Sequence, residues 1–182
     1  MSASYILHTS LTKFLPSILK DKQIKAKKPS DAGRKGVYGM FLSKNINYKG
    51  PDWYYGSWIP PFTRKIIFCI DPAILHKLQF VVCPRIQYGL CEPVMTQDNL
   101  SLTKLEKFIN GQMALAIKNK SADTGFMHTH EVCIGGSIPL EYVKQIIVSP
   151  KEINMVREII KNAGYADSIR VIKKPLDWHD IF

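Results

Sequence analysis

Short runs of β-branched and aromatic residues recur along the whole chain, with three stretches of helical spacing between them. A β-branched side chain packs well on a pleated surface, so such runs are typical of strands. Every run is far shorter than the roughly 18 apolar residues of a membrane-spanning helix. The sequence predicts strands at residues 4–8, 36–43, 65–70, 79–83, 131–135, 143–148 and 169–172.

The first two helical stretches repeat apolar residues at intervals of three and four, which is the spacing of a helix packed along one face. The first helix is expected to begin close to residues 13–15, with Pro16 in its opening turn. The second covers residues 105–117. The packed face of the first helix is predicted to contain Leu11, Phe14, Leu15, Ile18 and Leu19.

A third helix is predicted after residue 149. Ser149 is expected to cap it, Pro150 to take its first position and Glu152 to complete a capping box. Gly164 follows the last apolar residue of the stripe and is expected to end the helix.

The predicted elements lack the regular strand–helix alternation of a parallel α/β sheet, which indicates an α+β fold. No linker divides the chain, and 46% of its 182 residues are hydrophobic, so we expect a single domain over residues 1–182. Within it, two small mixed or antiparallel sheets are expected to pack together with flanking helices. Because no secretory leader is visible, we expect a cytoplasmic protein with reduced cysteines and no membrane contact.

Basic residues are concentrated near the N-terminus. Residues 1–50 contain ten Lys or Arg and two Asp, a balance of +8 out of a net charge of +10. Such a cluster can hold the phosphates of a nucleic acid, and it can equally be a solvated lysine-rich surface. The candidate nucleic-acid-binding residues are Lys22, Lys25, Lys27 and Lys28.

The sequence gives little support to a metal site or to a glycine-rich phosphate-binding loop. His128, His130, Glu131 and Cys133 crowd one short segment, but no second ligand pair has metal-binding spacing, so no metal is expected. The chain also has neither of the glycine-rich phosphate loops GxxxxGK[ST] and GxGxxG.

Three separated segments fit together better. His8 ends the run YILH and is followed by Thr9, Ser10 and the helix that contains LPSIL. The second segment, GMFLSKNINY, comes directly after Tyr38, and the third, HEVCIGGSIPLEYV, contains Glu131.

These segments resemble the ADP-ribosyltransferase superfamily, most closely its DarT-type enzymes and secondly the poly-ADP-ribose polymerase branch. The first is similar to the DarT-type opening, the second to the GIYF-type strand and its following tyrosine, and the third to the strand of the catalytic glutamate. The sequence departs from the pattern at Phe41, where the polymerase branch has Tyr, and at Thr129, where some relatives have Glu or Gln.

The resemblance implies a mono-ADP-ribosyltransferase that uses NAD as co-substrate. Glu131 would be the catalytic residue, since a carboxylate opposes the charge of an oxocarbenium-like ribose. His8 and Ser10 would hold ribose hydroxyls, and Arg34 would hold the pyrophosphate. The nicotinamide ring would stack between Phe41 and Tyr48, with Tyr38 as the alternative aromatic residue.

Three functions stay open at this point. The acceptor can be a nucleic acid, it can be a protein or water in an enzyme of the same fold, or the chain can be a non-catalytic basic module that binds nucleic acid. Glu131 distinguishes the enzymes from the non-catalytic module, because a phosphate-binding surface has no use for a carboxylate. The enzyme hypothesis predicts that His8, Phe41 and Glu131 face one cleft.

Overall fold

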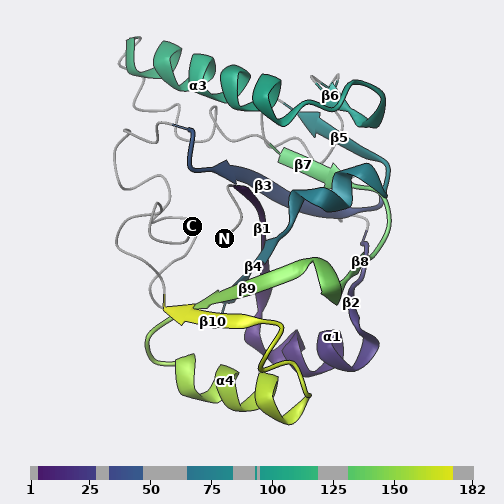
Figure 1. Ribbon diagram of the computed structural model, residues 1–182, viewed down its shortest axis with the longest axis vertical. Helices are drawn as coiled ribbons and strands as arrows, with labels where there is room; N and C mark the ends of the chain where they lie inside the picture. The colour runs from purple at the N-terminus through teal and green to yellow at the C-terminus, as the bar shows by residue number, and fades with distance from the viewer. Residues whose placement is uncertain are drawn as a thin grey trace.

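The computed structural model describes residues 4–27, 33–46, 65–83, 93, 95–118 and 131–173, with the side chains of one helix described as far as residue 111. These ranges contain ten short strands, which Figure 1 places around the middle of the molecule. The strands are β1 (Ser4–Leu11), β2 (Gln23–Ile24), β3 (Val37–Ser43), β4 (Lys65–Ile70), β5 (Phe80–Cys83), β6 (Met95–Thr96), β7 (Glu131–Ile134), β8 (Ile138–Pro139), β9 (Val143–Val148) and β10 (Arg170–Lys173).

Three α-helices accompany the strands within the described ranges: α1 (Leu15–Asp21), α3 (Leu102–Lys118) and α4 (Ile153–Asn162). Pro16 lies in the first turn of α1, as predicted. Gly164 follows the end of α4 with φ +78°, a left-handed conformation that favours glycine. Short 3₁₀ helices occur at η1 (Thr12–Phe14), η2 (Pro72–His76), η3 (Gln97–Asn99) and η5 (Leu140–Tyr142).

The predicted start of α4 is wrong. The helix begins at Ile153, and the side chain of its N-cap residue, Glu152, makes no capping hydrogen bond. The Glu152 carboxylate instead accepts hydrogen bonds from the Thr12 hydroxyl at 3.2 Å and the Ser149 hydroxyl at 3.4 Å. A long-range contact with Thr12 at the start of η1 therefore takes the group that a local capping box would have used.

The strands form one large sheet and one small sheet. Eight strands are ordered β10-β9-β4-β1-β3-β7-β5-β6, and β2 pairs with β8 beside them. Within the large sheet β10 and β9 are parallel, while the other neighbouring strands are antiparallel. The α+β class is confirmed, but the two sheets are of very unequal size.

The three helices pack on the same side of the large sheet. Leu15 of α1, Leu105 of α3 and Val156 of α4 belong to one buried cluster with Phe68 of β4. A smaller buried cluster on the opposite side includes Tyr5, Leu7, Met40, Leu42 and Ile67. In Figure 1, α3 lies at one end of the molecule, and α1 and α4 lie at the other.

Strands β1 and β3 separate part of the way along their length. They pair only from Ser4–Ser43 to Leu7–Met40. Beyond this point β1 pairs with β4 alone, and the first residues of β3 pair with β7. Gly39 lies at the fork, where an added Cβ would be 2.7 Å from Cγ2 of Ile6 and 2.8 Å from the carbonyl oxygen of Leu7.

Within the described ranges, no helix has the length and apolar character to cross a membrane.

The described cysteines are in two states. Cys69 and Cys133 are buried free thiols, whereas Cys83 is disulfide-bonded. The expectation that the cysteines are reduced is therefore wrong for Cys83.

Candidate active site

A cavity of about 790 Å³ lies at the fork between β1 and β3. The last four residues of β1, His8 to Leu11, form one wall, and residues 36–38 form another. Helix α1 and the segments on either side of it complete the lining with Phe14, Ser17, Ile18, Asp21, Gln23, Ile24, Lys25 and Lys27. This volume lies in the usual range of small-molecule and cofactor sites, about 300–1,000 Å³.

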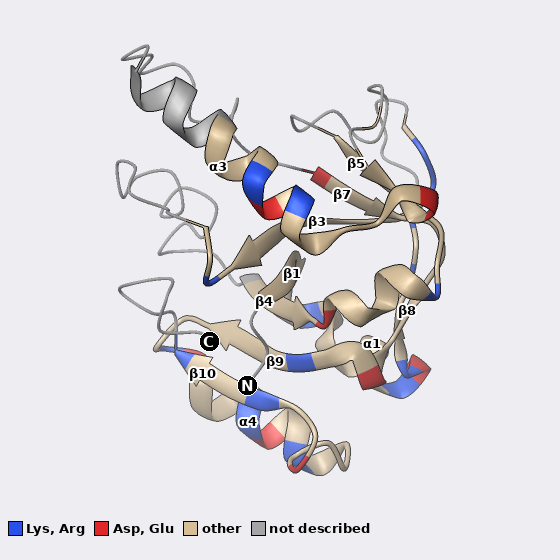
Figure 2. Cartoon of the chain, turned by 45° about the horizontal axis from the view of Figure 1, so that its top comes forward, with Lys and Arg blue, Asp and Glu red and all other residues tan. Residues whose placement is uncertain are grey.

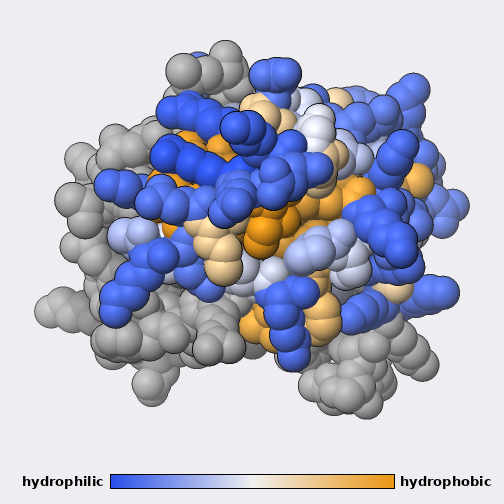
Figure 3. All heavy atoms as spheres, turned by 90° about the horizontal axis from the view of Figure 1, so that it is seen from below, coloured by the Kyte–Doolittle hydropathy of each residue, from blue (hydrophilic) through white to orange (hydrophobic). Residues whose placement is uncertain are grey.

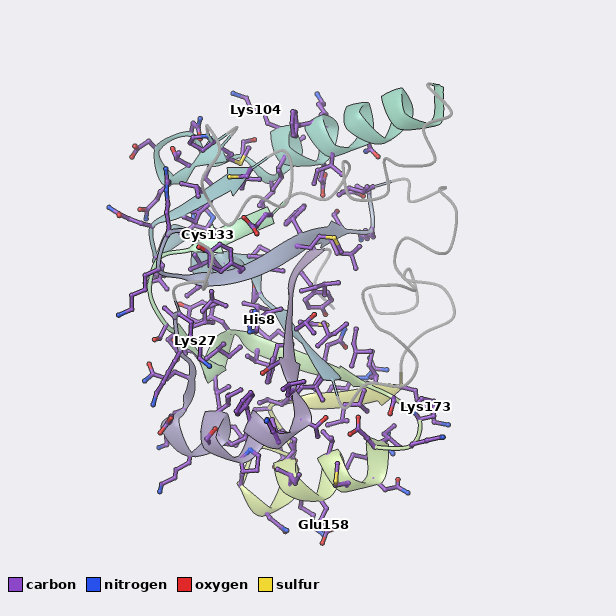
Figure 4. All side chains as sticks on the ribbon, turned by 180° about the vertical axis from the view of Figure 1, so that it is seen from behind. His8, Lys27, Lys104, Cys133, Glu158 and Lys173 are labelled. Atoms are coloured by element: carbon purple, nitrogen blue, oxygen red, sulfur yellow. The ribbon has the colours of Figure 1, made fainter. Side chains whose placement is uncertain are left out.

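His8 is held across the fork by a hydrogen bond. Its Nδ1 lies 2.6 Å from the backbone oxygen of Tyr38, and its ring stacks beside Phe68 with the centroids 6.3 Å apart. Burial is the main cause that lowers the pKa of His8, and the charge of Lys27, labelled with it in Figure 4, acts in the same direction.

The hydrogen bond to Tyr38 and the lowered pKa together indicate the protonation state of the His8 imidazole. A lowered pKa favours the neutral ring, and a carbonyl oxygen can only accept a hydrogen bond, so the single proton is on Nδ1 of His8. Nε2 is then an acceptor. A neutral His8 can therefore accept a hydrogen bond from a hydroxyl group in the cavity.

Tyr38 connects this cavity with the next strand. It lines the cavity, it is paired with Cys133 on β7, and its hydroxyl donates to the backbone oxygen of Arg34. Burial raises the pKa of Tyr38, and the Cys133 thiol and the charge of Glu131 raise it further. Tyr38 thus lines the cavity and also experiences the charge of Glu131.

Glu131 opens β7 and is only 5% exposed. It lies opposite Met40 of β3 and Cys83 of β5. Its negative charge also contributes to the raised pKa of Cys133, after burial. Glu131 is not among the described residues that line the cavity. Its charge acts on Tyr38, which does line the cavity.

Phe41 does not lie where the sequence interpretation put it. It is 2% exposed, pairs with Ile6 and belongs to the main core. Because neighbouring residues of a strand face opposite sides, Phe41 and Met40 point to different faces of the sheet. Of His8, Phe41 and Glu131, only His8 is among the described lining residues, so the expected common cleft is not seen.

Arg34 lines a second cavity. This cavity has a volume of about 380 Å³ and includes Lys35, Gln79 and Cys133 among its lining residues. Residues 34–38 therefore separate two cavities, with Arg34 on one and Tyr38 on the other.

The basic candidates divide into two groups. Lys25 and Lys27 line the main cavity, where Nζ of Lys25 lies 2.7 Å from Oδ2 of Asp21. Lys22 is exposed after α1, in a left-handed conformation with φ 54°. Figure 2 shows Lys and Arg together with Asp and Glu on α1 and α4, while the central strands carry few charges.

Of the remaining candidate site residues, some lie in the described ranges and some do not. Ser10 lines the cavity two residues after His8, as expected from their spacing on one strand. Tyr48, Lys28 and the histidines at 128 and 130 lie outside the described residues. Among the described residues, no group of three His, Cys, Asp or Glu side chains is arranged to hold a metal ion.

Phe14 was missed as a site residue. The helical spacing predicted it on the packed face of α1, but it precedes the helix, is 41% exposed and lines the main cavity. The sequence feature that could have indicated a binding role for Phe14 is its position directly after Lys13, in the most basic part of the chain.

No protein-family model matches the chain. No curated protein matches it either.

Solved structures do resemble it. DarT from Thermus sp. 2.9 in complex with NAD+ has a TM-score of 0.63 at 16% identity, covering 94% of this chain and 95% of that chain. The same protein in complex with ADP-ribosylated ssDNA has a TM-score of 0.59 at 17% identity, covering 94% of each chain. Thermosipho africanus DarTG in complex with ADP-ribose has a TM-score of 0.55 at 13% identity, covering 94% of this chain and 50% of that chain. The chain therefore has a DarT-like ADP-ribosyltransferase fold.

Proposed function

We propose that the protein transfers ADP-ribose from NAD+ to an acceptor and releases nicotinamide. The observation that carries this proposal is the cavity at the β1–β3 fork, with a neutral His8 held across it. Support comes from the fold, since the similar structures are described as complexes with NAD+ and with ADP-ribose.

The reaction breaks the bond between the ribose C1′ and the nicotinamide nitrogen. The electron pair of this bond stays with the nitrogen and neutralises the pyridinium, so nicotinamide leaves uncharged. A nucleophilic atom of the acceptor then bonds to C1′ and loses its proton. Between these events the ribose has oxocarbenium character, as in glycoside cleavage.

His8 and Ser10 bind the sugar in this proposal. Nε2 of His8 accepts a hydrogen bond from a ribose hydroxyl, and the Ser10 hydroxyl can donate or accept beside it. Among the described strands, the part of β1 that contains both residues pairs with β4 and not with β3, so its edge toward β3 is available to a ligand in this proposal. The nearby Lys27 helps to keep His8 neutral and so preserves its acceptor.

Glu131 supplies the negative charge. Its carboxylate is buried, so its field is less screened than that of a surface group. A charge fixed before the reaction lowers the energy of the oxocarbenium-like ribose more than that of bound NAD+. We assign the aromatic contact with nicotinamide to Tyr38 instead of Phe41, because Tyr38 lines the cavity and lies close enough to Glu131 to experience its charge.

The basic segment beside the cavity bears on the acceptor. We infer that the acceptor is a nucleic acid, because the segment after α1 carries the exposed Lys22 together with Lys25 and Lys27 of the cavity lining. A structural neighbour is described with ADP-ribosylated ssDNA. A protein acceptor, or water as in an NAD glycohydrolase, would use the same NAD site.

The test measures nicotinamide release from NAD+ by the purified protein, alone and with single-stranded DNA, RNA or a protein mixture. The proposal predicts release that a nucleic acid stimulates, together with a mass increase of one ADP-ribose unit on that nucleic acid. Release without transfer would indicate a glycohydrolase. Binding of nucleic acid without any release would indicate the non-catalytic module.

A further inference from the structure

Phe14 is an exposed aromatic residue in the wall of the main cavity. It is 41% exposed and, among the described residues, shares this exposure with only one other large hydrophobic residue, Met155. Figure 3 views the molecule from the side of α1 and α4, where hydrophobic atoms lie open between hydrophilic side chains. Such exposure in a cavity wall leaves part of the ring accessible to a ligand.

Two lysines flank this ring. Nζ of Lys13 lies 5.1 Å from the ring centroid of Phe14, and Nζ of Lys27 lies 5.3 Å from it. Both distances are within the range of a cation–π contact, about 6 Å. Lys27 also lines the cavity, so at least one ammonium group is positioned to reach a ligand there.

Among the described lining residues, Asp21 is the one acidic residue near these lysines. The Asp21 carboxylate lies 2.7 Å from Nζ of Lys25, which offsets its charge. The local balance is therefore positive, and an anion can approach.

We propose that Phe14, Lys13 and Lys27 bind the adenosine diphosphate half of NAD+, with the adenine stacked on the Phe14 ring and the lysines on the pyrophosphate. This inference rests on the proposed function. The aromatic face of Phe14 suits a planar base such as adenine, and the two ammonium groups suit the two negative charges of the pyrophosphate. Arg34, the candidate for the pyrophosphate on sequence grounds, lines the other cavity.

The path of the chain supports this orientation. His8 and Phe14 are separated by three strand residues and one 3₁₀ turn, so they are at most about 16 Å apart along the backbone. An extended dinucleotide bridges such a distance. With the nicotinamide end at His8 and Tyr38, the adenine end then lies at Phe14.

The experiment measures binding of ADP and of nicotinamide mononucleotide by calorimetry to the wild type, Phe14→Ala, Phe14→Trp and the control Met155→Ala. We expect Phe14→Ala to weaken ADP binding at least about fivefold, the lower end for an aromatic residue stacked on a base. The affinity for nicotinamide mononucleotide should change less than about twofold, because this ligand lacks adenine. Phe14→Trp should restore ADP binding, and Met155→Ala should match the wild type.

The lysines are tested separately with Lys13→Met/Lys27→Met against Lys161→Met, a lysine of α4 that is not among the described lining residues. The double variant should weaken ADP binding, and the difference from the wild type should shrink as salt rises, because salt screens the attraction. Lys161→Met should have no effect.

The outcomes separate this inference from the proposed function. ADP binding within twofold of the wild type in Phe14→Ala overturns the inference, even if NAD+ is cleaved. An equal weakening of both nucleotides, or weaker binding of an oligonucleotide alone, also overturns it. ADP binding that depends on Phe14 in a protein that releases no nicotinamide supports the inference and contradicts the proposed catalysis. A wild type that binds neither ADP nor NAD+ overturns both.

Discussion

His8 shows how burial and one hydrogen bond define a functional group. The unfolded chain holds this imidazole near its ordinary pKa of about 6.5, whereas burial lowers the pKa in the fold. Between these two values the unfolded chain binds more protons than the folded protein. The free energy of unfolding therefore rises with pH through this interval and falls as the pH drops below about 6.5.

The lowered pKa predicts a pH dependence of stability that His8 controls. Urea unfolding between about pH 7.5 and pH 5 should give a stability that declines toward the acid end. In His8→Gln, which does not titrate there, the decline should be smaller. Equal slopes for the two proteins would mean that His8 titrates normally in the fold.

Phe41 provides a second test at the residue scale. Its 2% exposure predicts that Phe41→Ala destabilises the protein by about 3–5 kcal/mol, the usual cost of removing a buried aromatic ring. Phe41→Leu should retain much of the stability and leave NAD+ affinity unchanged. A Phe41→Leu protein that is stable but no longer binds NAD+ would restore the stacking role that the sequence suggested.

At the scale of elements, the fork between β1 and β3 depends on Gly39. A Cβ at this position would be 2.8 Å from the backbone oxygen of Leu7, which cannot rotate away. Gly39→Ala should therefore destabilise the protein by about 1–3 kcal/mol, as overpacking does. Gly111→Ala on α3 is the matched control, because no atom of the described residues lies within 4 Å of its added Cβ, and it should be neutral or stabilising by up to about 1 kcal/mol. Thermal unfolding of both variants checks this, and equal effects would contradict it.

The longer strands were predictable because their residues carry the signal themselves. The runs at β4 and β9 are β-branched or aromatic over most of their length and form strands with the predicted bounds. β2 and β8 have two residues each and exist because they pair with each other across more than 100 positions, which no local pattern reveals. The start of α4 failed for the same reason, since Thr12 binds Glu152 from a distant part of the chain.

The candidate site was predictable in part. The motif around residue 8 led to a residue that lines the cavity, although β1 continues to Leu11 and does not end at His8 as the sequence suggested. The motif around residue 41 led to a residue whose side chain is buried in the main core, because a shift of one residue along a strand exchanges the core face for the other face. Phe14 was missed because its exposure depends on where α1 begins, and the helical spacing alone did not fix that point.

At the scale of the whole molecule, the uneven charge predicts a binding surface. Lys20 and Lys22 are exposed at the end of α1 and are not among the described residues of the cavity lining. Lys20→Glu/Lys22→Glu should weaken oligonucleotide binding and lower the slope of affinity against salt by roughly one unit for each of the two lysines that touches a phosphate. NAD+ affinity should stay unchanged. Salt titrations that do not distinguish the variant from the wild type would indicate a solvated surface.

Cleavage of NAD+ with the help of Glu131 is tested most directly by comparing the wild type with one variant. Nicotinamide release and NAD+ affinity are measured for the wild type and for Glu131→Gln, which keeps the size of the side chain and removes its charge. We predict that release falls by about 10² or more, the scale of removing one electrostatic stabiliser, while NAD+ affinity is retained. Release within a few-fold of the wild type would contradict the claim.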